Sequence, residues 1–171
     1  MRLDSEALLE QIQPFLIKLG EGIGDPAENA QGIIDLVGRR YSVLAKACEV
    51  DNPVIQRGLG QALTFRTSHD ECLYTMASRN DSEVTMTRLS PALIRIAMAN
   101  PALADQVVKL VTARNDVDGL YDRGQDHDEA ALVVAELKTL ARTEGCAEET
   151  AREASELAHI IQAELETMRG E

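Results

Sequence analysis

The residues of this sequence best suited to holding a metal form two pairs with a spacing of three positions. Glu156 and His159 form an E-x-x-H pair, and on a helix this spacing places carboxylate and imidazole on one face. Di-iron helical bundles use two such pairs with carboxylates from two further helices, whereas this sequence contains one pair. His69 and Cys72 have the same spacing, but no spacing rule for metal ligands supports them. Exposed side chains on an amphipathic helix are therefore favoured over a metal site.

A run of acidic residues in the second half of the chain suggests a calcium loop. Aligned from Asp118, its ligand positions one, five, nine and twelve hold Asp118, Asp122, Asp126 and Glu129. Calcium loops of this type need glycine at position six for a sharp turn, and this sequence has Arg123 there. We therefore expect a solvated loop whose aspartates cap the next helix.

Motifs for covalent or phosphate chemistry are absent from the sequence. It contains no G-x-S-x-G elbow, Walker loop or H-E-x-x-H, and it has three histidines. The glycine-rich segment 20–24 precedes an expected helix, but Glu21 and Asp25 would repel phosphate. The sequence therefore favours a non-catalytic protein without a cofactor, and the segment 20–24 is expected to be a linker.

Composition places the chain among folded proteins of a reducing compartment. Of 171 residues, 44% are apolar and 27% charged, which is typical of globular domains. No stretch approaches the roughly 18 apolar residues of a membrane span, and the first residues lack the apolar core of a signal peptide. Cys48, Cys72 and Cys146 are odd in number and widely separated, so we expect free, buried thiols. We expect a cytoplasmic protein that does not contact membranes.

Charge is unevenly distributed along the chain. The net charge is −12, and residues 124–171 contribute twelve acidic and four basic residues to it. Such a surface repels the phosphates of nucleic acids and anionic lipids, so neither is an expected partner. It would attract a basic protein surface. Arginine greatly outnumbers lysine, which is typical of GC-rich genomes, so we expect a bacterial origin.

Four of the five prolines follow a residue type that commonly caps helices. They occur in Asp25-Pro26, Asn52-Pro53, Ser90-Pro91 and Asn100-Pro101. A side-chain oxygen at the capping position accepts a hydrogen bond from a free backbone N–H, and proline next to it has no N–H to satisfy. Each dipeptide therefore predicts a helix start.

Apolar residues recur at helical spacing along most of the chain. The first helix is expected to be kinked or split at Pro14 and to end at Gly20, Gly22 and Gly24. Further helices are expected at 26–50, from 53 onward, and at 91–99, 101–114, 128–144 and 147–168. Glu83–Leu89 alternates like a strand, but a lone strand has no partner, so we expect a loop or irregular helix. The sequence predicts an all-α, compact multi-helix bundle of about eight helices with short, proline-capped connections.

Glycines weaken the helix expected after residue 53. Gly58 and Gly60 have no side chain to pack and lower helix propensity. Their positions favour close packing against a neighbouring helix.

The expected C-terminal helix carries an apolar stripe at near-heptad spacing. The stripe consists of Ala154, Leu157, Ile161, Leu165 and Met168. It would form an interface with a partner or a second copy, or it would pack inside the domain, and the sequence leaves both alternatives open. We expect a single domain over residues 1–171, with a subdivision into a core at 1–123 and an acidic helical hairpin at 124–171.

These patterns favour a non-catalytic protein-binding or regulatory helical module, such as an adaptor, chaperone or immunity-like protein, with an acidic contact surface. The expected partner is a protein with a basic surface, and a homodimer through the C-terminal helix is a further hypothesis. Two alternatives stay open. One is a helical-bundle metal-binding protein or enzyme that uses Glu156 and His159, and the other is a small-ligand sensor domain.

Overall fold

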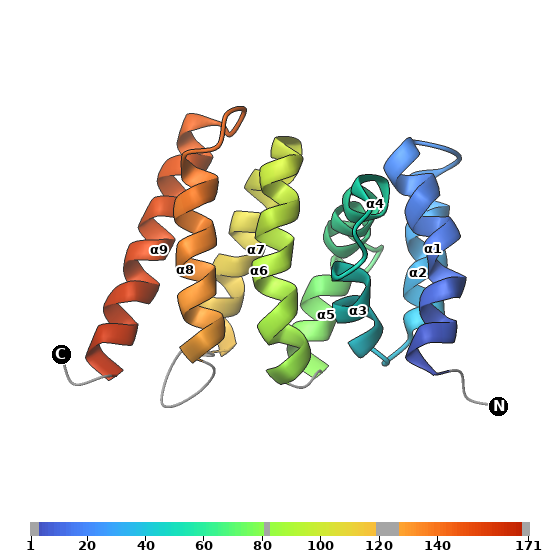
Figure 1. Cartoon of the computed structure of the whole chain (residues 1–171), viewed down its shortest axis with the longest axis horizontal. Helices are drawn as coiled ribbons and strands as arrows, with labels where there is room; N and C mark the ends of the chain where they lie inside the picture. The colour runs from blue at the N-terminus through green and yellow to red at the C-terminus, as the bar shows by residue number, and fades with distance from the viewer. Residues whose placement is uncertain (1–3, 81–82, 119–126, 169–171) are drawn as a thin grey trace. The chain divides into compact units, whose positions relative to one another are not determined.

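The computed structural model describes the backbone of residues 4–80, 83–118 and 127–168, and every regular element in these ranges is helical (Figure 1). Side chains of 78–80, 83–88, 116–118, 127–129 and 168 lie outside the description. The elements are α1 (Ser5–Glu21), α2 (Pro26–Val37), α3 (Ser42–Cys48), α4 (Pro53–Thr64), α5 (Leu73–Asn80), α6 (Glu83–Ala99), the 3-10 helix η1 (Pro101–Leu103), α7 (Ala104–Asp118), α8 (His127–Ala141) and α9 (Glu148–Met168). The all-α prediction is confirmed for these ranges.

The chain divides into two compact units, residues 1–89 and 90–171. The division falls within α6 and differs from the subdivision expected at residues 123 and 124. The single domain expected over residues 1–171 and its subdivision therefore stay predictions from sequence. α7, α8 and α9 all belong to the second unit.

In the first unit, α1 packs against α2, α3 and α4. Two glycines let the backbones of α1 and α4 meet. A Cβ atom on Gly20 would overlap the carbonyl oxygen of Val54, and one on Gly58 would overlap the carbonyl oxygen of Leu16. The close packing expected at Gly58 is therefore present, and no side chain separates the two helices there.

Side-chain caps begin α2 and α4 as expected. Oδ1 of Asp25 accepts a hydrogen bond from the backbone N–H of Ala27 (3.0 Å), and Oδ1 of Asn52 accepts one from that of Val54 (2.9 Å). The proline after each capping residue occupies the first helical turn. Two of the four predicted helix starts are therefore confirmed.

The glycine-rich segment after α1 is a hydrogen-bonded helix end. Gly22 has φ 73°, and its N–H donates to Leu19 (3.3 Å) while that of Ile23 donates to Lys18 (2.8 Å). This pair of bonds is a Schellman motif, which satisfies carbonyls at the end of a helix. The side-chain amide of Asn29 also donates to the carbonyl of Ile23 (2.9 Å), so the segment is tied to α2.

Two expectations in the first unit require correction. Of the kink or split expected at Pro14, the split is wrong, because Pro14 lies inside the continuous helix α1. The helix expected at 26–50 ends at Val37, because Gly38 adopts φ 57° and ψ −114°, which no regular helix continues through. Residues on both sides of Gly38 keep apolar spacing because α2 and α3 both bury a face, so spacing alone could not reveal the break.

α6 also departs from the sequence-based expectation. Glu83–Leu89, expected to be irregular, forms its first half, and Pro91 lies inside the helix instead of starting one. A helix pairs most of its own backbone N–H and C=O groups, whereas a lone strand leaves them without partners. A helix is therefore favoured over a strand for Glu83–Leu89.

The predicted start at Asn100-Pro101 is only partly correct. Pro101 begins the short 3-10 helix η1, and α7 follows it. Asn100 makes no side-chain cap to η1. Its side-chain amide instead donates a hydrogen bond to the carbonyl of Ile96 (3.0 Å), near the C-terminal end of α6.

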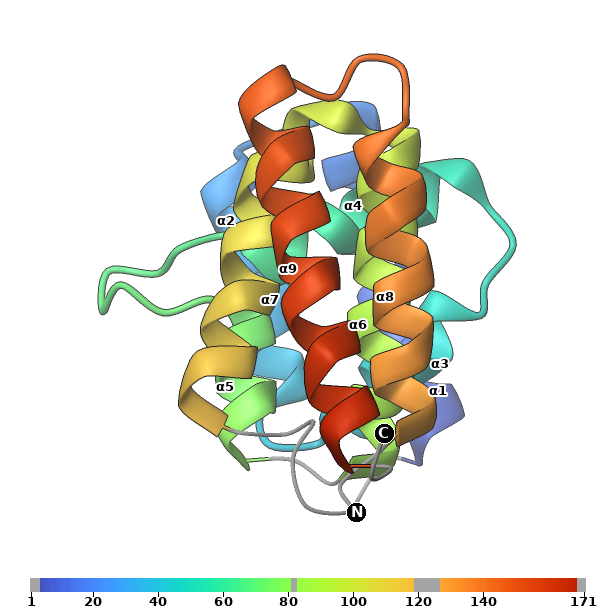
Figure 2. The same ribbon diagram turned by 90° about the vertical axis from the view of Figure 1, so that its left-hand side faces the viewer.

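In the second unit, α9 lies between α7 and α8 (Figure 2). The connection between α8 and α9 contains Gly145, whose φ of 92° suits glycine, and both helices lie close to the predicted ranges. Nη1 of Arg95 on α6 lies 3.4 Å from Oε1 of Glu136 on α8. One side of α9 and the facing side of α7 together line a groove.

Candidate functional site

The apolar stripe on α9 is part of the interior of the second unit. Ala154, Leu157, Ile161 and Leu165 are each at most 4% exposed, and α9 contacts both α7 and α8. The side chain of Met168 lies outside the described residues. Of the two alternatives for the stripe, an interface or packing inside the domain, the second holds for the four described residues. They pack within the chain and are not available as a contact surface.

The remaining surface of α9 is acidic. The helix contains six glutamates and one arginine, and all of these side chains are exposed or half-buried. Glu148 and Glu149 lie in the first turn, where carboxylates favourably oppose the positive end of the helix dipole, so they have a structural role. Glu153 and Glu156 lie further along, and both border a groove.

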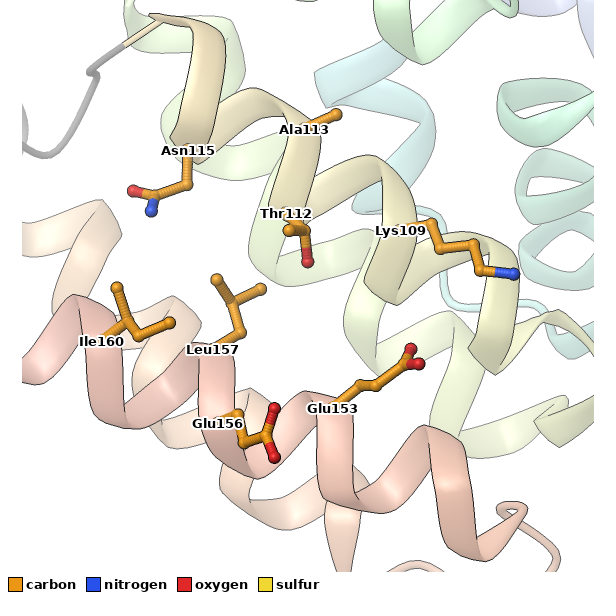
Figure 3. A pocket seen from close by; sticks show the side chains of 8 residues that line it. All are labelled: Lys109, Thr112, Ala113, Asn115, Glu153, Glu156, Leu157 and Ile160. Atoms are coloured by element: carbon orange, nitrogen blue, oxygen red, sulfur yellow. The ribbon is translucent and has the colours of Figure 1, made fainter.

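The groove runs between α7 and α9 and has a volume of about 380 Å³ (Figure 3). Its lining residues are Lys109, Thr112, Ala113 and Asn115 on α7, and Glu153, Glu156, Leu157 and Ile160 on α9. Ile160 is 50% exposed, and of the three large apolar side chains exposed among the described residues (Ile23, Leu132 and Ile160) it is the one that lines the groove. The groove therefore combines an aliphatic surface with two carboxylates.

The positive charge of Lys109 is offset by a neighbouring carboxylate. Its Nζ lies 2.8 Å from Oδ2 of Asp105, one turn earlier on α7. The pKa of Lys109 is raised, first by this hydrogen bond and the charge of Asp105, and further by Glu153 and Glu149. The lysine is therefore a cation already paired with a carboxylate, and the acidic end of the groove stays net negative.

Asn115 is the least exposed polar group of the groove. It is 8% exposed, and Figure 3 shows its amide directed across the groove toward Ile160. No hydrogen bond joins this amide to any other residue that the structure describes. The hydroxyl of Thr112, by contrast, donates to the carbonyl of Val108 (2.7 Å). Asn115 therefore offers a donor and an acceptor to whatever occupies the groove.

Sequence reasoning missed Asn115, although a pattern that indicates its burial is present. Val108, Val111 and Asn115 are spaced by three and then four positions, which places them on the same face of a helix. Continuing the buried stripe of α7 by one turn places a polar side chain in the interior. The neighbouring Arg114 is 3% exposed, and its burial is indicated in the same way by its helical spacing from the buried Val107 and Val111.

The candidate metal ligands are divided between the two units. Glu156 and His159 are both exposed on α9, and Glu156 borders the groove. In the first unit, His69 lies in an exposed turn, while Cys72 is buried with its Sγ 3.1 Å from Oγ1 of Thr75. Across the described ranges, no three His, Cys, Asp or Glu residues are grouped as metal ligands would be.

The acidic residues considered for calcium fall largely outside the description. Asp122 and Asp126 are not described, and neither are the side chains of Asp118 and Glu129. The calcium hypothesis therefore stays a prediction from sequence.

The three cysteines, all of them described, form no disulfide with one another, as expected, but they differ in burial. Cys72 is buried, whereas Cys48 and Cys146 are only half-buried, which corrects the expectation of three buried thiols. Burial raises the pKa of the Cys146 thiol by disfavouring the thiolate. Cys146 is therefore less nucleophilic at neutral pH than an ordinary cysteine, and it does not resemble an activated catalytic thiol.

Comparisons with protein-family models, with curated proteins and with solved structures find no match to this chain. Within the described ranges, no helix has both the length and the apolar character needed to cross a membrane.

Proposed function

We propose that this chain is a non-catalytic protein-binding or regulatory module whose contact surface is the α7–α9 groove with the adjoining acidic flank of α9. The observation that supports this proposal is the exposed Ile160 beside Glu153 and Glu156. Specific interfaces commonly surround an apolar contact with polar and charged groups. In the part of the chain that the structure describes, no three His, Cys, Asp or Glu side chains are grouped at the groove as metal ligands would be.

Charge argues for a partner with a basic surface. The glutamates of α9 face solvent, and the single lysine of the groove is paired with Asp105. A basic partner would be drawn to this surface during diffusion, and matching charges would orient it on contact. We therefore expect association that weakens steeply as salt is added, because exposed charges are screened within about 8 Å at physiological ionic strength.

The same charges argue against a homodimer through α9. A symmetric dimer brings the same patch of each copy together, so the acidic flank of one α9 would face its duplicate. Like charges in such an interface are destabilising. The apolar stripe of α9, which could have formed the dimer interface, is buried inside the second unit. A different protein is the better-supported occupant.

The alternative function as a metal-binding protein or enzyme has a direct test. Stoichiometric iron, zinc or manganese in protein purified without a tag would favour it over the protein-binding proposal. Glu156 and His159 would then need ligands from outside the described residues, because no third ligand accompanies them there.

The protein-binding proposal is tested by quantitative cross-linking and affinity purification from the cells that make the protein. The test compares the native chain with the double variant Glu153→Gln and Glu156→Gln. We expect a defined partner that is lost from the double variant and released by salt. The matched control is Glu166→Gln, which makes the same chemical change on α9 away from the groove. Equal capture by all three proteins would contradict the proposal.

A further inference from the structure

The α7–α9 groove has a length that matches a short extended segment. Along α9, Glu153 and Ile160 are seven residues apart, which corresponds to roughly 10 Å of helix. An extended chain covers this distance with about three residues at 3.3 Å each. The groove volume of about 380 Å³ lies at the small end of ligand sites and also suits an occupant of this size.

The two ends of the groove differ in chemistry. Figure 3 shows Glu153 near Lys109 at one end, Leu157 in the middle, and Ile160 with Asn115 at the other end. A cationic side chain matches the carboxylate end, and an aliphatic side chain matches the Ile160 end. An anionic occupant is disfavoured because it would face Glu153 and Glu156.

The amide of Asn115 distinguishes an extended segment from a helix. A carboxamide supplies one acceptor and N–H donors, which complement the C=O and N–H of a peptide group. Backbone groups inside a helix are already bonded to each other, whereas those of an isolated extended segment are free. An amide that is 8% exposed and has no bond to other described residues gains most from such a partner group.

We propose that the groove binds a short extended peptide segment of a partner protein with a basic residue and, two positions later, an aliphatic residue. Residues i and i+2 of an extended segment point to the same side about 6.6 Å apart, which matches the roughly 6 Å of helix between Glu156 and Ile160. A long basic side chain at position i covers the remaining distance to Glu153. The basic side chain pairs with Glu153 and Glu156, the aliphatic one covers Ile160, and a peptide group bonds to Asn115. This inference rests on the proposed protein-binding function and names the chemistry of the segment.

The test uses the full chain labelled with ¹⁵N and two capped probe peptides, Ac-Gly-Arg-Ala-Leu-Gly-NH2 and Ac-Gly-Glu-Ala-Leu-Gly-NH2. We expect amide shifts confined to residues 109–115 and 153–160, and affinity for the arginine peptide about tenfold or more above that for the glutamate peptide. No saturable shifts with the arginine peptide at up to about 5 mM, or equal affinity for both peptides, would overturn the proposal.

Three variants separate the contributions of the two carboxylates, the aliphatic contact and the Asn115 amide to peptide binding, and a fourth is the control. Glu153→Gln with Glu156→Gln should remove most of the preference for the arginine peptide, and Ile160→Glu should weaken binding of both peptides. Asn115→Leu should weaken binding while the charge preference persists. Glu166→Gln should match the native chain. Binding that is unchanged by Ile160→Glu and Asn115→Leu would show attraction by charge alone and would reject the groove as the site.

The outcomes also separate this inference from the function on which it rests. A cellular partner that depends on Glu153 and Glu156, together with no binding of either peptide, would reject the extended segment and leave the protein-binding function intact. Site-specific peptide binding without a dependent cellular partner would support the groove and reject the wider function.

Discussion

A single glutamine completes the end of α3. Nε2 of Gln56, on α4, donates to the carbonyl oxygens of Cys48 (3.0 Å) and Val50 (2.7 Å) and lies 3.4 Å from that of Ala47. Carbonyls at a helix end have no partner within the helix, so they depend on such side chains or on water. The carbonyls of Ala47 and Val50 also accept from the backbone N–H groups of Val50 (3.2 Å) and Asn52 (3.0 Å). Losing the half-buried amide of Gln56 would therefore remove hydrogen bonds from this helix end without leaving these two carbonyls unpaired.

Replacing Gln56 with methionine keeps the approximate size of the side chain and removes the donor. We expect Gln56→Met to lower the free energy of unfolding by about 1–3 kcal/mol, because it removes the two shorter hydrogen bonds of the amide, each with a net contribution of roughly 0.5–1.5 kcal/mol. Urea denaturation followed by circular dichroism measures the change.

The control for this prediction is Gln31→Met in the same unit. Gln31 is exposed on α2 and its amide bonds to Asp35 (2.9 Å), so the change should stay within about 0.5 kcal/mol. Equal effects of the two substitutions would show that the carbonyls after α3 do not need Gln56.

The crossing of α1 and α4 depends on the absence of a side chain at Gly58. Alanine normally favours a helix over glycine by about 1 kcal/mol, so an unconstrained Gly58→Ala change would stabilise the protein. Here the new methyl group would overlap the backbone of Leu16, which cannot move without separating the two helices. We expect the free energy of unfolding to fall by about 1–3 kcal/mol, measured by thermal and urea denaturation.

Gly32→Ala on α2 is the comparison for Gly58→Ala. A methyl group at Gly32 would meet the ring of Phe15, 2.9 Å away at its nearest atom. That ring is half-buried and belongs to a side chain, so it can rotate aside at lower cost than backbone. A loss of stability at Gly32 as large as at Gly58 would contradict the argument from backbone contact.

Pro14 marks a weak point inside α1. Its ring removes one backbone hydrogen bond and crowds the preceding turn, yet its side chain is exposed and contributes little packing. We expect Pro14→Ala to raise the free energy of unfolding by about 1–3 kcal/mol, because helix-interior proline is about 3 kcal/mol worse than alanine and part of this is returned through the less restricted unfolded chain.

The same substitution at Pro26 provides the contrast, since that proline lies in the first turn of α2 where no hydrogen bond is lost. Its effect should stay within about 0.5 kcal/mol. Denaturation curves that show no gain for Pro14→Ala would contradict the argument that Pro14 weakens α1.

For the whole chain, the burial of the α9 stripe predicts the result of removing residues 146–171. Deletion would expose the faces of α7 and α8 that α9 covers, so the second unit should lose structure and not merely a contact surface. Hydrogen exchange followed by mass spectrometry should show lost protection in α7 and α8. The buried residues of α1 to α4 pack among themselves, so their protection should persist. Full protection of α8 in the shortened chain would contradict this prediction.

The helical class and several helix ends could be predicted from sequence because they depend on neighbours along the chain. Asp25 and Asn52 cap helices with bonds to residues two positions away. The predictions at Pro91 and over 26–50 failed because proline after serine and continuous apolar spacing are each compatible with more than one helix boundary. The local pattern determined that the chain is helical and which side chains are apolar.

Only the tertiary structure decided what the apolar face of each helix contacts. The stripe from Ala154 to Leu165 was equally compatible with an interface and with a core, and the packing of α7 and α8 against it places it inside. The groove likewise joins Asn115 on one helix with Ile160 on another, forty-five positions later in the sequence. Helical periodicity orients a side chain about its own helix, whereas burial and pocket formation depend on which other helix comes to lie beside it.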